Sequence, residues 1–179
     1  MICNVNIAGL CKDCESSRGG IVEVYAFNYG EITGVTETAG TINGISLATG
    51  GKAYKYEFRK GTGSMTSTLT VDPANGVNYV STELVLQFTK METRKRIEMA
   101  ALAVGELAFI VKDANGIYWF LGKDEPVTAT AGTGQTGQAV GDGNFYNITF
   151  TDESKSWPME VLDSVVEGLT ISPDCSSQS

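Results

Sequence analysis

Alternation of apolar and polar residues with a period of two dominates the chain and predicts β-strands. Residues 19–27 and 41–48 form two such runs, and residues 145–151 form the last clear one. Dipeptides that favour tight turns interrupt the alternation at intervals: Asn43-Gly44, Asn75-Gly76, Asn115-Gly116 and Asp142-Gly143. The pattern therefore predicts a meander of strands.

Two hairpins are expected from the spacing of these runs and turns. Residues 53–60 and 64–71 both alternate, and Gly61-Thr62-Gly63 between them suits a tight turn. Residues 107–112 and 117–121 flank Asp113-Ala114-Asn115-Gly116 and predict the second hairpin.

The longest alternating run, residues 77–91, exceeds the about five or six residues of a typical strand. Leu84, Leu86 and Phe88 share its apolar face, which Val80, Thr82 and Lys90 extend. In the run 64–71, the hydroxyl residues Ser64, Thr66, Thr68 and Thr70 share one face. We therefore expect a sheet with one face against a core and one face toward water.

Residues 93–104 are the segment in which helical spacing is clearest. Apolar residues recur there at Ile97, Ala100, Ala101 and Val104, and Thr93 is a candidate N-cap. A strand remains open for this segment, because Ile97, Met99 and Ala101 also fit a period of two. Residues 161–166 are compatible with either a short helix or a strand.

Two glycine-rich segments carry few large apolar side chains. Residues 128–143 hold five glycines and predict a loop or an irregular edge, and residues 30–51 are similarly poor in apolar mass. We expect both to be mobile in an isolated subunit and ordered in an assembly. The spacing Gly132-x-Gly134-x-x-Gly137 matches a dinucleotide fingerprint only in its letters, since no apolar strand precedes it and no helix follows.

The predicted fold class is mainly β: an antiparallel β-sandwich or partial barrel with one packed α-helix. At 179 residues and 42% hydrophobic content, the chain is long enough to bury one core and short for two. We expect an N-terminal arm over residues 1–19, a single sandwich domain over 20–167, and a C-terminal tail over 168–179.

The charge of the chain argues against a groove that binds nucleic acid, because the 21 acidic residues outnumber the 13 basic ones and the net charge is -8. The basic run Arg94-Lys95-Arg96 is short and is expected to form a solvated helix face or a salt bridge between subunits. No run approaches the roughly 18 apolar residues of a membrane span, and the N-terminus lacks the pattern of a signal peptide. We expect a protein that is made in the cytosol, stays soluble there and has no membrane partner.

The chain contains no histidine, which removes the commonest general base and metal ligand. We therefore expect no catalytic residues, no cofactor and no enzyme; an enzyme working with carboxylates alone, as in glycoside hydrolysis, is the remaining enzymatic alternative. Asp142, Asp152 and Glu153 form no calcium-binding loop pattern, so we interpret them as solvated loop acids.

Three interpretations of the cysteines stay open: a zinc site, a dithiol redox site and free thiols. Cys11 and Cys14 have the spacing of a zinc knuckle or a dithiol redox site, and a four-thiolate zinc site would also need Cys3 and Cys175. A redox motif normally opens a helix after a strand, which is not predicted here. Free thiols in a reducing cytosol are the favoured interpretation, with Cys11 and Cys14 as weak metal candidates.

Several runs resemble virion proteins of bacteriophages that infect Bacteroidota, in an order of elements typical of tail-tube proteins. These runs are EFRKGTGSMTSTLTV, NYVSTELVLQFTKMETRKRIEMAALA, VKDANGIYWFLGKDEPV and GTGQTGQAVGDGNFYNITFTDE, and the resemblance covers residues 20–161. It implies a β-sandwich whose long strand pair lines the interior of a ring, a helix packed outside the sandwich, and loops or termini that stack hexameric rings into a tube.

On this interpretation the protein is a structural virion component, made in the host cytoplasm, that assembles with itself and other virion proteins and carries DNA only as transient cargo. Two rows of residues are expected to face the lumen. One is the hydroxyl face of residues 64–71, and the other is the face of residues 77–91 that lies opposite Leu84 and Leu86. Together they comprise Ser64, Thr66, Thr68, Thr70, Ser81, Glu83, Val85 and Gln87. A wall without cations would give DNA no anchoring points. Glu83 is alternatively a partner of Lys90 or Arg94 at a subunit contact.

Two other functions stay open. The protein could be another virion component, such as a capsid decoration, a connector or a cargo protein. It could also be a module that binds a host-surface ligand through an aromatic platform of Tyr118, Trp119 and Phe120.

Overall fold

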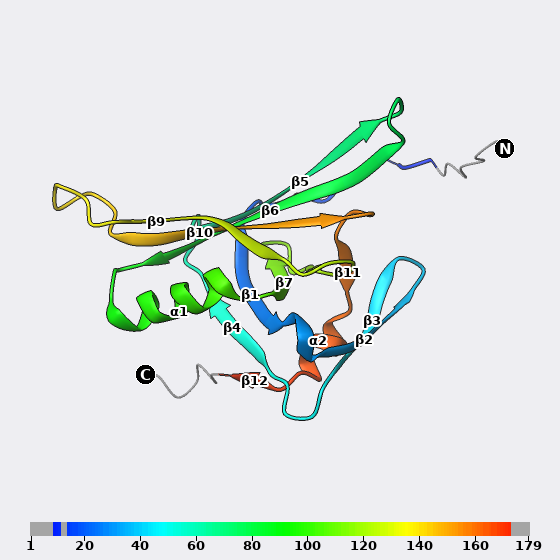
Figure 1. The fold of residues 1–179 in the computed structure, drawn as a ribbon. Helices are drawn as coiled ribbons and strands as arrows, with labels where there is room; N and C mark the ends of the chain where they lie inside the picture. The colour runs from blue at the N-terminus through cyan, green and yellow to red at the C-terminus, as the bar shows by residue number, and fades with distance from the viewer. Residues whose placement is uncertain (1–8, 12–13, 173–179) are drawn as a thin grey trace.

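Two β-sheets form most of the computed structural model, which describes residues 9–11 and 14–172 (Figure 1). The larger sheet has eight strands in the order β12-β4-β1-β7-β8-β11-β3-β2, and the smaller has four in the order β5-β6-β10-β9. The larger sheet comprises β1 (Ile21–Asn28), β2 (Ile32–Thr38), β3 (Thr41–Leu47), β4 (Ala53–Glu57), β7 (Leu107–Asp113), β8 (Tyr118–Leu121), β11 (Met159–Val161) and β12 (Ile171–Ser172).

The four-stranded sheet comprises β5 (Gly63–Asp72), β6 (Val77–Thr89), β9 (Thr128–Gln135) and β10 (Phe145–Ser154). Helical segments are η1 (Tyr29–Glu31), α1 (Thr93–Val104) and α2 (Asp163–Glu167). No helix among the described residues has both the length and the apolar character that crossing a membrane requires.

Strands β1 and β7 lie at the centre of the molecule and are buried on both faces. In β7, Phe109 and Val111 contribute to one core, whereas Ala108 and Ile110 contribute to a second core on the opposite face. This double burial accounts for the nearly continuous apolar sequence LAFIV, in which a period-two pattern is lost. The second core is covered by β3 and β11 of the larger sheet and by α2.

The inner face of the four-stranded sheet packs on the first of these cores. Leu84 and Leu86 from β6 and Phe150 from β10 are fully buried there, and the rings of Phe150 and Phe109 are 4.8 Å apart. The hydroxyl groups of Ser67 and Thr82 also lie on this face and hydrogen-bond each other at 2.8 Å, so neither is left unpaired. The two sheets therefore form a sandwich.

The predicted fold class is confirmed: the protein is mainly β, with two packed sheets and a helix, and it is not a closed barrel. The four-stranded sheet is antiparallel throughout. The eight-stranded sheet departs from the predicted antiparallel arrangement at two short pairings, because β11 runs parallel to β3 and β12 runs parallel to β4.

The hairpin predicted around residues 61–63 is wrong, whereas the turn predicted at Asn75-Gly76 is confirmed and joins a hairpin. β4 pairs with β1 in the larger sheet, whereas β5 pairs with β6 around the turn at Asn75-Gly76. The Asp72 carboxylate accepts hydrogen bonds from the backbone N–H groups of Ala74 and Asn75, which fixes that turn. Residues 58–62 instead cross from one sheet to the other. The hairpin predicted between β7 and β8 is confirmed.

Both glycine-rich segments contain strands, which matches the irregular edge predicted within residues 128–143 and the strand predicted at residues 41–48. Residues 128–135 form β9, paired with β10, and only residues 136–144 remain a loop. Residues 30–51 contain the β2–β3 hairpin. Backbone hydrogen bonds hold both, so a low apolar content did not prevent pairing.

The predicted helix is confirmed as α1, but its orientation is not the expected one. Met99 is half-buried and Leu102 is buried, whereas Ile97 and Val104 of the predicted apolar face are 58% and 86% exposed. Thr93 is the first helical residue and not the N-cap, which is Glu92.

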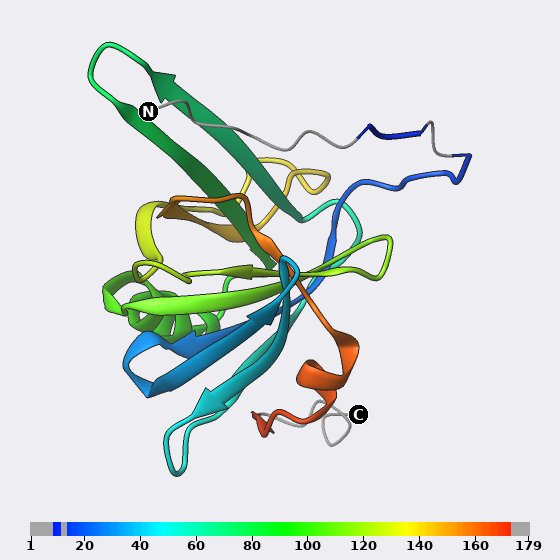
Figure 2. The same ribbon diagram turned by 90° about the vertical axis from the view of Figure 1, so that its right-hand side faces the viewer.

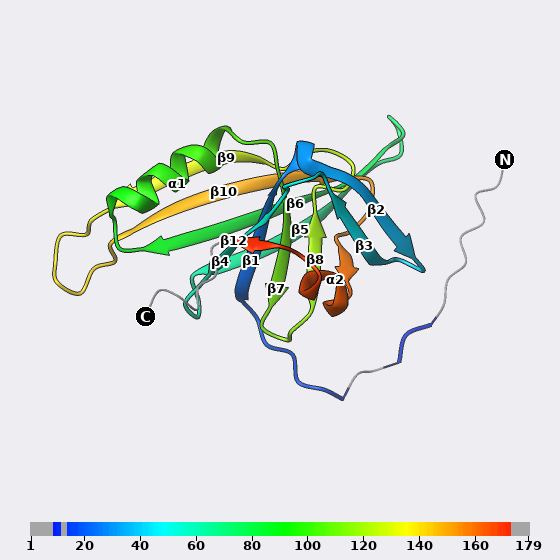
Figure 3. The same cartoon turned by 90° about the horizontal axis from the view of Figure 1, so that it is seen from below.

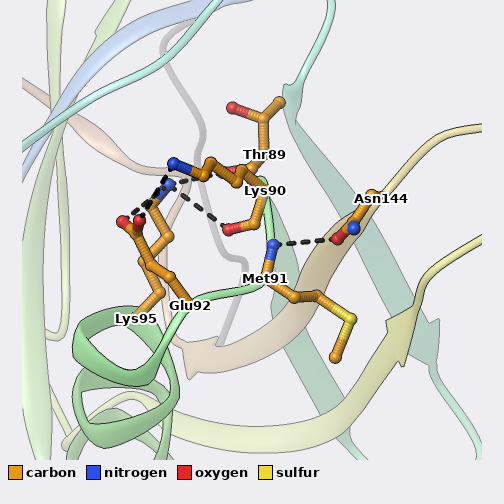
Figure 4. A network of polar contacts seen from close by, with 6 residues as sticks. All are labelled: Thr89, Lys90, Met91, Glu92, Lys95 and Asn144. Carbon is orange, nitrogen blue, oxygen red and sulfur yellow. Dashed lines mark hydrogen bonds and ion pairs between the residues drawn. The ribbon is translucent and has the colours of Figure 1, made fainter.

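Contacts between charged and backbone groups hold the start of α1 (Figure 4). The Glu92 carboxylate forms an ion pair with the Lys95 ammonium group at 3.2 Å. Lys95 also donates a hydrogen bond to the Thr89 carbonyl at 2.5 Å. The Asn144 side chain accepts a hydrogen bond from the Met91 N–H at 2.8 Å. These contacts tie the helix to the adjoining ends of β6 and β10.

Replacing Leu86 with aspartate is expected to abolish folding, because the new charge would lie unpaired in the first core. The cost is on the order of 5 kcal/mol, comparable with the whole stability of a domain. Circular dichroism and soluble yield measure the effect. Leu69→Asp is the matched control: Leu69 lies on the same face of the sheet but is 44% exposed, so its variant should fold. A folded Leu86→Asp protein would refute this account of the sandwich.

Candidate functional site

The outer face of the four-stranded sheet is the candidate site. Strands β5, β6, β10 and β9 turn this face away from the core, and no other described strand or helix packs on it. Figure 1 shows the sheet as one long layer lying above the rest of the fold. Its alternation follows from the packing, because burying Leu84, Leu86 and Phe150 sends their sequence neighbours outward.

All eight residues predicted to face a lumen lie on this one face. Ser64 opposes Val85, Thr66 opposes Glu83, and Thr68 opposes Ser81 across the β5–β6 pair. Thr70 continues the row of β5, and Gln87 continues that of β6. Ser64, Thr66, Thr68, Thr70 and Glu83 are exposed, and Ser81, Val85 and Gln87 are half-buried. Their common placement is a structural fact; their role in a channel is a prediction.

Strands β10 and β9 extend the polar face with residues that sequence reasoning missed. Asn147, Thr149, Thr151 and Glu153 of β10 lie beside the outward row of β6. The Thr130 hydroxyl of β9 lies 3.1 Å from that of Thr151 and so shares the face. Alternation in FYNITFTDES was the available signal for β10, whereas the small residues of β9 predicted only a loop or an irregular edge.

The electrostatic character of the face is weakly acidic. The strands β5, β6, β9 and β10 contain no lysine or arginine, whereas Glu83 and Glu153 project outward from neighbouring strands. Hydroxyl and amide groups supply most of the other polar side chains. Such a surface offers hydrogen bonds but no cation to a phosphate backbone.

Both edges of this sheet are open within the described residues. β5 pairs with β6 alone, and β9 pairs with β10 alone. The β5–β6 hairpin also extends past the end of β10, whose last residue, Ser154, is opposite Val80 (Figure 2). Each open edge presents a row of unpaired backbone N–H and C=O groups, with which another strand can form hydrogen bonds.

A buried carboxylate, Asp152, lies at the end of β10 on the inner face. It is 3% exposed and accepts a hydrogen bond from the Ser154 hydroxyl at 2.9 Å, while its second oxygen has no partner among the described residues. Burial raises the pKa of this carboxyl above its usual value, and the nearby acids Asp124 and Glu125 act in the same direction.

The weak metal candidates Cys11 and Cys14 are both exposed free thiols. Cys3 and Cys175 lie outside the described residues. Over the part of the chain that the structure describes, no group of three or more histidine, cysteine, aspartate or glutamate side chains is arranged to hold a metal ion.

The predicted aromatic platform is divided between the two sides of β8. Phe120 is buried in the second core, and Tyr118 packs at a ring distance of 6.3 Å from Tyr25. Trp119 is half-buried and donates its indole N–H to the Asp113 carboxylate at 3.2 Å. The three rings therefore present no common exposed surface.

Comparison with known proteins gave no relative: no protein-family model matches the chain, and no curated protein or solved structure is significantly similar to it.

The raised pKa of Asp152 predicts a pH dependence of stability. Since its pKa is higher in the folded chain, this carboxyl favours folding most below its unfolded pKa of about 3.9 and loses that contribution as pH rises through the folded pKa. Asp152→Asn removes the titration. We expect the melting temperature of the wild type to rise relative to that of the variant as the pH is lowered from neutral toward that unfolded pKa. A difference that stays constant with pH in thermal unfolding would contradict the assignment.

Proposed function

We propose that this protein is a non-enzymatic structural subunit that assembles into closed rings, which stack as the tail tube of a bacteriophage virion. The observation that carries the proposal is the four-stranded sheet with two open edges and an outer face free of cations. Adding a neighbour at each edge would satisfy the backbone groups there and make the outer faces one continuous wall.

Strand directions support a head-to-tail ring. The four strands alternate in direction, so the two edge strands, β5 and β9, run opposite ways. β9 of one copy can therefore pair antiparallel with β5 of the next, and the same contact can repeat around a ring. Six copies per ring is what the resemblance to tail-tube proteins implies.

The composition of the edge strands also supports partners at both edges. Proteins that remain monomeric commonly protect their edges with lysine, with proline or with an inward charge. Neither β5 nor β9 contains a lysine, an arginine or a proline. Strands of this composition are suited to pairing with another chain.

DNA is the proposed cargo because the wall lacks binding cations. Duplex DNA is held by proteins chiefly through lysine and arginine contacts to its phosphates. A lining of hydroxyl groups with Glu83 and Glu153 would let DNA pass without being retained. Other virion proteins would complete the particle, which would be assembled in the host cytoplasm.

Assembly of the purified full chain tests the proposal. Negative-stain microscopy and sedimentation velocity over a range of concentrations should show rings or tubes of one diameter. A protein that stays monomeric at every concentration would contradict the proposal and favour a binding module.

The Glu83→Lys variant tests the lumen assignment. It should still assemble, and its tubes should retain short duplex DNA that wild-type tubes do not, because each ring would gain a circle of cations. Co-sedimentation with DNA at low and high salt measures this. Glu167→Lys, an exposed site on α2, is the control with the same charge change. Failure of Glu83→Lys to assemble would favour the ion pair between subunits, and assembly without DNA retention would place Glu83 outside the lumen.

A further inference from the structure

One side of helix α1 is apolar and has no partner within the described chain. Ile97, Ala100, Ala101 and Val104 follow the spacing i, i+3, i+4, i+7 and so form one stripe. At about 100° per residue this stripe lies opposite the side that carries Met99 and Leu102 to the first core. Ile97 and Val104 are 58% and 86% exposed.

The stripe lies beside an open edge of the four-stranded sheet. Figure 3 shows α1 running alongside β9, the strand at that edge. The end of the helix is fixed there, because Leu107, three residues after Val104, exchanges backbone hydrogen bonds of 3.1 and 2.7 Å with Val127. Val127 directly precedes β9, so Val104 is held near the first residues of that strand.

The other open edge carries a matching apolar pair. Leu69 and Val71 of β5 lie on the inner side of the sheet, as Met65 does. Met65 packs on the first core, but the β5–β6 hairpin extends beyond that core, so Leu69 and Val71 are 44% and 55% exposed. They lie in the C-terminal half of β5. A strand that pairs antiparallel with β9 brings its C-terminal half beside the first residues of β9.

We infer that the apolar stripe of α1 is a docking surface for a second copy of this chain, and that it receives Leu69 and Val71 of that copy. This inference rests on the proposed ring, in which β5 of one copy pairs with β9 of the next. Sheet continuity puts the inner side of the neighbour's β5 on the same side of the wall as α1. The contact buries apolar side chains that are exposed in the isolated subunit, and it adds hydrophobic burial to the backbone pairing at the edge.

A double variant, Ile97→Gln with Val104→Gln, tests the surface without adding charge or weakening the helix, because glutamine is a good helix former. Its melting temperature as a monomer should match that of the wild type. The protein concentration needed for assembly, measured by sedimentation velocity, should rise about tenfold or more. Leu162→Gln is the control, since Leu162 is a similarly exposed apolar residue before α2 (42%) and should assemble as the wild type does.

The outcomes separate the two proposals. A wild type that never assembles overturns the ring and this inference with it. A wild type and a double variant that assemble at the same concentration overturn the docking surface and leave the ring standing.

A photo-reactive benzophenone side chain placed at position 104 identifies what contacts the helix. After irradiation of the assembled full chain, mass spectrometry should locate cross-links between subunits in residues 63–72 of the neighbour. Cross-links from helix to helix, or to the eight-stranded sheet, would overturn the inference.

Discussion

Burial of one face of the four-stranded sheet against β1 and β7 is the constraint on which the rest of the structure depends. Phe150, Leu84 and Leu86 pack on Phe109 and its neighbours, and each strand then turns its alternate residues outward. A shift by one residue in any strand would exchange the buried and hydroxyl-bearing rows. The same packing that stabilises the fold therefore defines the polar face and fixes its composition.

That packing uses only one face of the sheet and neither of its edges. The backbone groups along β5 and β9 are worth about 1 kcal/mol net per hydrogen bond once paired, so a strand of eight to ten residues offers several kcal/mol to a suitable partner. A second copy of the chain is the proposed partner, since the two edge strands run in opposite directions. The proposed self-assembly through these edges would connect the fold to the proposed tube.

The sequence predicted the β-rich sandwich, the helix and the common face of Ser64, Thr66 and Glu83, because alternation and helical spacing are local signals. It failed where pairing was decided by distant partners. Gly61-Thr62-Gly63 has the composition of a turn, yet β4 gains more by pairing with β1 at the centre of the larger sheet. For β9 the sequence predicted only a loop or an irregular edge, because backbone hydrogen bonds to β10 hold this strand and its small side chains carry no pattern.

The helix illustrates a different limit of sequence reasoning. Apolar residues at helical spacing predicted the contact face of α1, but Ile97 and Val104 are exposed while Leu102 is buried. The spacing of apolar residues indicates which side of a helix is apolar. It does not distinguish a side that packs on the protein's own core from a surface that another subunit would cover.

Hydrogen exchange of the backbone amides tests the central claim, that the two sheet edges pair between subunits, most directly. The N–H groups of β5 and β9 that point away from β6 and β10 should exchange rapidly in dilute protein and become strongly protected under assembling conditions, while β7, already internal, should not change. Equal exchange of β5 and β9 in the dilute and assembled states would contradict the account.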